Sequence, residues 1–235
     1  MIRLHQFPRS FGLPNPSPFC MKVETYLRLA DIPYEIVDLH DPRKGPKGKG
    51  PFITDGGRTI ADSHFILDHL KATYGDPLGQ GLDARDRARH IALVRMCEEH
   101  LYFAAVRLRW LVPENAAIIR STFFTGMPAP LRPLVFRLAR AKIHRDLMGQ
   151  GMGRHTVAEV ERLGSEDVEV LSVTLGEAPF FGGDAPREVD CTTWGFIANL
   201  LVPPFRMRMK DEAAARPNLV AYHHRMMARM FPELG

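Results

Sequence analysis

Cysteine is scarce in this chain: its 235 residues include three, and the three lie far apart. Cys20, Cys97 and Cys191 show neither a CxxC pair nor the Cys/His spacing of a zinc site, so the sequence predicts no metal centre. A disulfide framework is excluded as well, because such frameworks need several paired cysteines in a short chain. The scarcity favours a reducing compartment, and we expect a cytoplasmic protein.

Long apolar runs and long runs of one charge are also missing. No window approaches the ~18 consecutive apolar residues of a membrane-spanning helix, and residues 1–6 lack the apolar core of a secretory signal. The formal net charge is +4. In the densest basic segment, 132–145, basic and apolar residues alternate, which predicts an amphipathic helix with a solvated face. An acidic partner or a membrane surface is the alternative for that helix, and no motif predicts a nucleic-acid partner.

The first third of the chain has the pattern of a small α/β domain. Hydrophobic residues make up 45% of the sequence, enough for one large core or two small ones. β-prone runs at 2–7 and 34–39 flank a helical segment at 18–30, which predicts a parallel βαβ unit. A hairpin at 52–61 with an Asp-Gly-Gly turn follows. A helix at 62–74 then completes the order βαβββα.

The remainder of the chain has almost no strand signals. Glycine-rich residues 75–81 predict a linker between a domain over 1–75 and an all-helical domain over 82–235. Thr156 and Glu159 predict a capping box at the start of one helix. Helices are expected over 83–112, 132–149, 156–175, 189–201 and 218–230. We therefore predict an α+β fold of two domains.

The segment after the first strand carries the clearest chemical signal. Ser17 is a favoured N-cap residue, and Pro18 suits the first helical position. A helix start exposes unpaired N–H groups and a partial positive charge, which together favour a nearby anion such as a thiolate. The alternative is that Ser17 only caps the helix.

Three landmarks in this order resemble those of the glutathione transferase superfamily. They are Ser17-Pro18-Phe19-Cys20 at the first helix, Gly50-Pro51-Phe52-Ile53 at a strand start and Asp62-Ser63 at the next helix start. The resemblance covers nearly the whole chain and implies a thioredoxin-like N-terminal domain. More narrowly, the segments 15–25, 98–102 and 151–156 look like the failed-axon-connections and metaxin-like branch.

The resemblance implies that glutathione is the co-substrate. The family residue that matches Ser17 donates a hydrogen bond to the glutathione sulfur and favours the thiolate. Each unit of pKa depression corresponds to about 1.4 kcal/mol of differential interaction. The same segment also resembles a glutaredoxin-type CPxC motif whose first cysteine is replaced, so thiol chemistry by Cys20 is an alternative. Cys97 and Cys191 are expected in the core.

The other matched positions imply a complete glutathione site. Pro51 matches a cis-proline that turns the Gly50 backbone toward the cysteinyl part of glutathione. Asp62 and Ser63 match residues that hold the γ-glutamyl end, with Ser63 at its carboxylate and Asp62 facing its amine; helix capping is the alternative for both. The loop before Gly50 is shorter than in the family, and we expect Lys49, together with Lys47, to contribute charge at the glycyl end.

The helix expected over 83–112 should line a cleft for the second substrate. Tyr102, Arg109 and Trp110 carry polar groups that need partners when buried, which makes them candidates for the substrate pocket. The alternative for this helix face is a helix–helix core.

The leading hypothesis is a glutathione transferase in which Ser17 activates the thiolate for attack on a small electrophile that the sequence does not identify. Family members usually form homodimers, and we expect one here. The second hypothesis is a non-catalytic binding or assembly module with the same fold. The third is a glutathione oxidoreductase that depends on Cys20.

Overall fold

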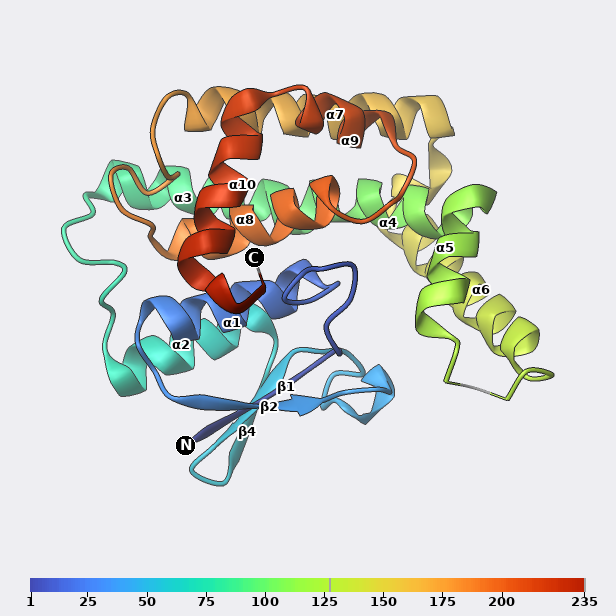
Figure 1. The fold of residues 1–235 in the computed structure, drawn as a ribbon, viewed down its shortest axis with the longest axis horizontal. Helices are drawn as coiled ribbons and strands as arrows, with labels where there is room; N and C mark the ends of the chain where they lie inside the picture. Colours follow the sequence, from blue (N-terminus) through green and yellow to red (C-terminus); the bar gives the residue numbers. More distant parts are fainter. Residues whose placement is uncertain (127, 235) are drawn as a thin grey trace.

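A four-stranded mixed sheet is the centre of the N-terminal domain in the computed structural model, which describes residues 1–126 and 128–234 (Figure 1). The strand order is β2-β1-β3-β4, with β1 parallel to β2 and antiparallel to β3. The elements of this domain are β1 Ile2–Gln6, α1 Pro18–Leu29, β2 Tyr34–Asp38, β3 Phe52–Asp55, β4 Arg58–Ala61 and α2 Ser63–Tyr74. The predicted order βαβββα and the parallel first pair are confirmed.

Helices form the second domain, which confirms the predicted α+β fold. They are α3 Ala84–Met96, α4 Tyr102–Leu111, α5 Pro113–Phe123, α6 Arg132–Gln150, α7 Val157–Leu175, α8 Glu188–Leu201, α9 Arg208–Ala214 and α10 Pro217–Met230. Short helical turns lie at η1 Pro42–Lys44, η2 Cys97–Leu101, η3 Met152–Arg154 and η4 Pro232–Leu234. The predicted capping box at the start of α7 is present, with Thr156 and Glu159 each accepting from the other's backbone N–H.

Two expectations for the helical domain need correction. The single helix expected over 83–112 is α3 and α4 joined by the π-helical turn η2. A π turn adds a residue to the helical repeat and so rotates the faces of α4 relative to those of α3. The sequence also predicts no helix after Pro113, yet α5 starts there. Pro113 ends α4 and occupies the first position of α5, where its missing N–H costs nothing.

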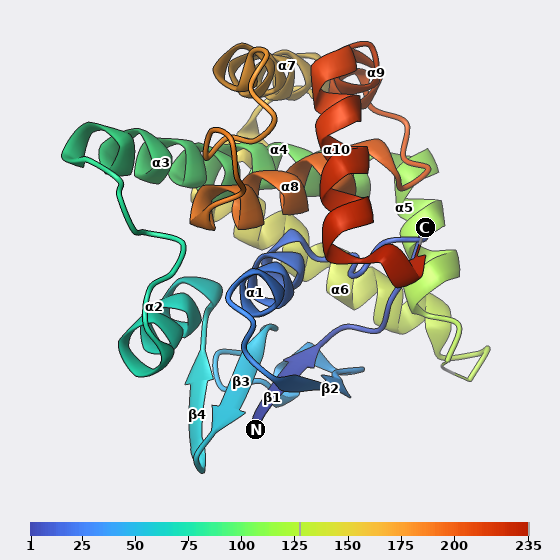
Figure 2. The same ribbon diagram turned by 60° about the vertical axis from the view of Figure 1, so that its left-hand side comes forward.

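Helix α1 lies between the sheet and the helical domain (Figure 2). One side places Val23, Tyr26 and Leu27 in the core that the sheet and α2 share. The other side approaches α8 so closely that a Cβ atom added at Gly195 would lie 2.8 Å from the Pro18 carbonyl oxygen. Glycine permits this approach because it has no side chain.

Buried polar contacts also join the two domains along α1. Lys22 Nζ lies 2.6 Å from Glu98 Oε1 in η2, and both side chains are almost fully buried. Asn199 of α8 donates a side-chain N–H to the backbone oxygen of Asn15 at 3.2 Å. The start of α1 is therefore held against the helical domain by both packing and hydrogen bonds.

Candidate functional site

The sheet register brings the predicted positions to one edge of the N-terminal domain. His5 of β1 lies opposite Phe52 of the antiparallel strand β3, so the residue before Phe52 lies where β1 ends. Phe52 also pairs with Ala61 at the end of β4, and α2 begins two residues later. Pro51 and Ser63 therefore share the edge at the carboxyl end of β1, where the loop to α1 departs. We call this edge the sheet-edge site.

Ser17 is the N-cap of α1, as predicted. Its hydroxyl oxygen accepts a hydrogen bond from the Cys20 N–H at 3.4 Å, and Pro18 occupies the first helical position. The Ser17 side chain is half-buried. Its hydroxyl is therefore reachable and lies beside the N–H groups that have no partner within the helix.

Asn15 positions Ser17, a role that the sequence analysis does not assign. The buried Asn15 side chain accepts a hydrogen bond from the Ser17 N–H at 3.0 Å and donates to the Phe7 carbonyl at 2.6 Å. An asparagine that accepts from the N–H two residues later forms an Asx turn. The Asn-Pro-Ser-Pro sequence is the signal from which this turn could have been predicted.

Cys20 lies in the first turn of α1 and is fully buried. Burial raises the pKa of its thiol to about 12, although the hydrogen bond with the Ser17 side chain acts in the opposite direction. Nucleophilic and redox-active cysteines need an accessible thiolate. The position therefore opposes the thiol chemistry considered for Cys20. Cys97 and Cys191 are buried, as predicted for core residues.

The Gly50–Pro51 peptide bond is cis, as the resemblance implies. Pro51 is buried and Gly50 half-buried, whereas Lys49 is exposed. Between β2 and Gly50 the chain forms only the short turn η1, which agrees with the predicted loop. The Lys49 side of the sheet-edge site is consequently more open than its Ser63 side.

Asp62 and Ser63 begin α2. Asp62 caps the helix by accepting from the His64 N–H at 3.1 Å, and Lys47 Nζ lies 3.9 Å from its second carboxylate oxygen. The φ of Asp62 is +85°, a value that residues other than glycine rarely adopt. Ser63 is buried, and its hydroxyl has no hydrogen-bond partner among the described residues. Its hydroxyl and N–H are thus available to an anion at the helix start.

Two of the three residues predicted for the substrate pocket, Tyr102 and Arg109, lie close enough for each to affect the pKa of the other, and the third packs on α6. The Tyr102 ring packs against Phe19 with centroids 5.0 Å apart and so lies beside the start of α1. Arg109 donates to the backbone oxygen of Asn199, and burial lowers the pKa of Arg109 to about 10. Trp110 stacks on an aromatic ring of α6. Tyr102 and Arg109 share one face of α4, whereas Trp110 projects about 100° away from Arg109. Tyr102 and Arg109 therefore lie toward α1 and α8, and Trp110 lies toward α6.

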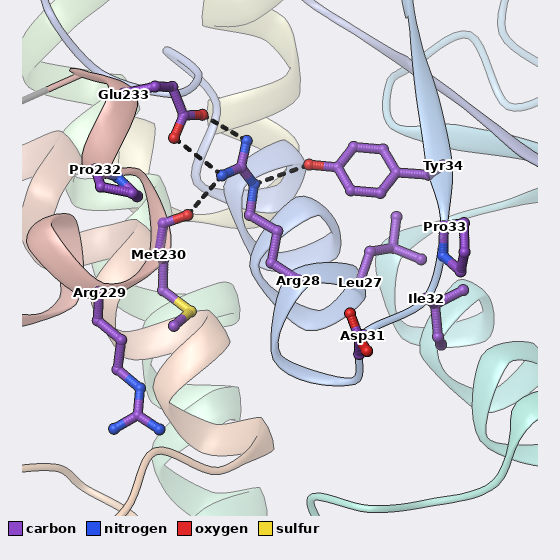
Figure 3. A pocket seen from close by; sticks show the side chains of 10 residues that line it. All are labelled: Leu27, Arg28, Asp31, Ile32, Pro33, Tyr34, Arg229, Met230, Pro232 and Glu233. Atoms are coloured by element: carbon purple, nitrogen blue, oxygen red, sulfur yellow. Dashed lines mark hydrogen bonds and ion pairs between the residues drawn. The ribbon is translucent and has the colours of Figure 1, made fainter.

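A cavity of about 490 Å³ lies at the end of α1 opposite Ser17 (Figure 3). Arg28 lies across it and donates to the Tyr34 hydroxyl at 2.9 Å, the Met230 carbonyl at 2.6 Å and the Glu233 carboxylate at 2.7 Å. These groups use their hydrogen-bonding capacity on one another. The polar groups of this cavity therefore serve to connect α1 to η4, and we assign the cavity no ligand.

Two features are absent from residues 1–126 and 128–234. None of the helices in these ranges is long and apolar enough to cross a membrane. The same ranges hold no cluster of three or more His, Cys, Asp or Glu side chains that could bind a metal ion.

Known proteins match both domains in the expected order. Residues 18–115 match the family model of the glutathione S-transferase N-terminal domain, and residues 164–226 match that of the glutathione S-transferase C-terminal domain. The chain is 32% identical to Failed axon connections of Drosophila melanogaster, over 99% of this chain and 59% of that protein. It is 30% identical to isoprene-epoxide–glutathione S-transferase of Rhodococcus sp. strain AD45, over 96% of this chain and 98% of the relative.

The fold is similar to that of a solved enzyme structure. The beta-etherase of Sphingobium sp. strain SYK-6 superposes with a TM-score of 0.70 at 17% identity, over 99% of this chain and 98% of that one. The chain spans less than two thirds of Failed axon connections but almost all of the Rhodococcus relative. Because both of its domains match the family models and the Rhodococcus relative is matched over almost its full length, the chain belongs to the glutathione S-transferase family.

Proposed function

We propose that this chain binds glutathione at the sheet-edge site and that Ser17 activates the thiol for attack on a small electrophile. The observation that carries the proposal is the meeting, at one edge, of the Ser17 N-cap, the cis Pro51 and the unpaired Ser63 hydroxyl. The full-length similarity to a glutathione S-transferase that acts on an epoxide supports it.

Each part of glutathione has a suitable partner in this arrangement. The γ-glutamyl carboxylate accepts hydrogen bonds from the Ser63 hydroxyl and N–H, and the Asp62 carboxylate faces the ammonium group. The cysteinyl backbone pairs with the extended chain at Gly50 and Pro51 as an added strand. Lys49 is placed to attract the glycyl carboxylate. The sulfur then lies at the start of α1.

Ser17 stabilises the thiolate in this scheme. A thiol with an ordinary pKa near 8.5 is mostly protonated at neutral pH. A donated hydroxyl hydrogen bond and the positive end of α1 together lower that pKa by roughly one to two units. The thiol proton leaves to solvent, and the sulfur electron pair forms a bond to the electrophilic carbon, whose leaving group takes the displaced pair. Tyr102 and Phe19 form an apolar wall beside the sulfur.

A non-catalytic binding module is the second candidate function. The single short turn η1 between β2 and Gly50 favours it, because it leaves the glycyl end of the site open. The similarity to Failed axon connections, whose name carries no enzymatic activity, is compatible with it, although the chain spans only 59% of that protein. Under this candidate the fold is kept while glutathione is not used.

Titration calorimetry with reduced glutathione tests the proposal. We expect saturable binding that Ser63→Ala weakens about tenfold, since it removes a hydrogen bond to a charged group. Ser17→Ala should leave the affinity within a few-fold but raise the bound thiol pKa by up to about one unit, since the positive end of α1 remains; the ultraviolet absorbance of the thiolate measures this shift.

Two controls separate the alternatives. Cys20→Ala should leave the thiolate absorbance unchanged, whereas a mixed disulfide with glutathione that this variant abolishes would support the oxidoreductase. Saturating ligand at ~100 Kd stabilises a protein by about 2.7 kcal/mol. An absence of both heat and thermal shift at millimolar glutathione would overturn the proposal and favour the binding module.

We further propose a homodimer, as is usual for the family, in the cytoplasm, as the scarcity of cysteine favours. Light scattering of the purified protein gives the mass, and a monomer at micromolar concentration would contradict this assignment.

A further inference from the structure

A second cavity, of about 460 Å³, lies between α4 and α6 and shares no residue with the sheet-edge site. Four of its six lining side chains are basic and none is acidic. We call it the cationic cavity; its lining residues are Arg107 and Leu111 of α4 and Arg137, Arg140, Ala141 and His144 of α6.

The arginines of the cationic cavity lack acidic partners among the described residues. Arg107 Nε is buried and has no hydrogen-bond partner there, and burial lowers the pKa of Arg107. Arg137 is exposed and forms no ion pair with a described carboxylate. Asp146, two residues after His144 on α6, binds Lys142 at 2.6 Å. Leaving a buried charged donor unpaired is unfavourable, so a ligand that supplies acceptor oxygens would be bound favourably.

Arg140 prepares the cavity for a negative charge. It donates from Nε to the Trp110 carbonyl at 2.9 Å and from one terminal nitrogen to the Leu111 carbonyl at 2.8 Å. These carbonyls end α4, and their partial negative charge would otherwise repel an anion. Arg140 neutralises that end of the helix, and its second terminal nitrogen makes no hydrogen bond to a described residue.

The cavity at the other end of α1 provides a contrast. There Arg28 is neutralised by Glu233 and Glu24, so its guanidinium is already bound. The cationic cavity has arginines of the same kind without those carboxylates. The concentrated positive charge without acidic partners favours ligand binding in the cationic cavity, whereas the paired charges around Arg28 favour a structural role.

We propose that the cationic cavity is a second binding site, for a small ligand that carries a phosphate or carboxylate group beside an apolar part. Guanidinium groups bind such oxyanions through paired hydrogen bonds. Leu111 and Ala141 offer an apolar wall. The volume falls within the range of roughly 300–1,000 Å³ that small-molecule sites occupy.

The oxyanion has two sources with the same chemistry, a soluble compound and the headgroup of an anionic lipid. A lipid headgroup is a candidate because α6 also exposes the apolar side chains of Leu134 and Leu138. Basic and apolar side chains on one exposed helix suit a lipid surface.

Calorimetry with 2-naphthyl phosphate tests the soluble source. We expect saturable binding that Arg107→Met weakens at least about tenfold and Arg137→Gln about threefold, because each removes a charge-assisted hydrogen bond. Arg137 is exposed, so its variant tests the cavity even if Arg107→Met fails to fold. Arg85→Gln, which changes an exposed arginine of α3, is the matched control and should bind as the unchanged protein does.

Sedimentation with phosphatidylcholine vesicles, with and without phosphatidic acid, tests the lipid source. Binding that requires phosphatidic acid and is weakened in Arg137→Gln assigns a headgroup, while binding of 2-naphthyl phosphate alone assigns a soluble ligand. No binding in either arm, or binding that Arg107→Met, Arg137→Gln and Arg85→Gln retain equally, would overturn the proposal. Glutathione titration is a separate readout, so failure here leaves the sheet-edge site untouched.

Discussion

The two ends of α1 satisfy their polar groups in opposite ways. At the C-terminal end, Arg28 binds Tyr34, Met230 and Glu233, and its guanidinium also lies 3.9 Å from the centroid of the Phe231 ring. At the N-terminal end, Ser17 accepts one long hydrogen bond and the neighbouring N–H groups have no partner within the helix. The C-terminal end, where a cavity of about 490 Å³ lies, is the saturated one.

The difference shows that empty volume and binding capacity are separate properties. A cavity whose polar groups are already paired offers a ligand little beyond the water it displaces. A helix-start hydroxyl that still has a proton to donate, as Ser17 does, offers a hydrogen bond whatever the volume beside it. We therefore expect changes at the C-terminal end of α1 to affect stability, and changes at the N-terminal end to affect ligand chemistry.

The largest effect is expected between the two ends, where Lys22 joins α1 to the helical domain. Glu98→Gln leaves the buried Lys22 ammonium without a charged partner, and removing one member of a buried ion pair costs about 3–5 kcal/mol. Urea unfolding followed by circular dichroism should show the free energy of unfolding reduced by about 3 kcal/mol. The double variant Lys22→Met/Glu98→Leu should recover most of that loss; an unchanged single variant would contradict the assignment.

A smaller loss of stability is expected at the C-terminal end of α1. Arg28→Met removes the hydrogen bonds to Met230 and Glu233 and should lower the free energy of unfolding by about 2 kcal/mol. Arg3→Met is the matched control, because the Arg3–Glu35 pair is 2.7 Å apart but about half exposed, and should cost less than ~1 kcal/mol. Glutathione affinity should stay the same in both variants; a change in Arg28→Met would break the division between the two ends.

The N-terminal end should show the reverse pattern. Ser17→Ala removes an N-cap and should lower the free energy of unfolding by about 1 kcal/mol, half of the effect at Arg28. Thermal unfolding measures this loss. The same variant should change the bound thiolate far more than Arg28→Met does, and equal effects of the two variants on the thiolate would refute the comparison.

The smallest effect concerns pH. The hydrogen bond from Arg28 lowers the pKa of Glu233 below its ordinary 4.5, although slight burial opposes this. A carboxyl with a depressed folded-state pKa contributes stability above pH 4.5 and loses it as the pH falls through that lower value. The melting temperature should therefore decrease below pH 4.5 more in the unchanged protein than in Arg28→Met. The corresponding difference in the free energy of unfolding should be under ~1 kcal/mol, because Glu233 is 46% exposed.

The predictable parts of the site are those that depend on local sequence. Ser17 with Pro18, and Asp62 before Ser63, specify helix starts by rules that act over a few residues. The sheet register then brings these starts to one edge. The strand order is not a local property, because β3 pairs with β1 and not with β2, which precedes it in the chain.

The unpredictable parts depend on packing between distant helices. The turn η2 changes which residues of α4 face the N-terminal domain, and nothing local in the sequence marks it. Arg109 is buried against α8 and Arg107 meets Arg137 only through the packing of α4 on α6. Spacing along one helix identifies residues that share a face, but it does not say which helix covers that face.

The close approach at Gly195 has a consequence for exchanging domains between relatives. The position of Pro18, and with it the site serine, is set by a residue in the other domain, since any side chain at 195 would displace the start of α1. A chimera that joins this N-terminal domain to a helical domain with a larger residue there would misplace the site while keeping all of its residues. In a functional chimera of two family members, residues 15–22 and 195–199 should therefore come from the same parent.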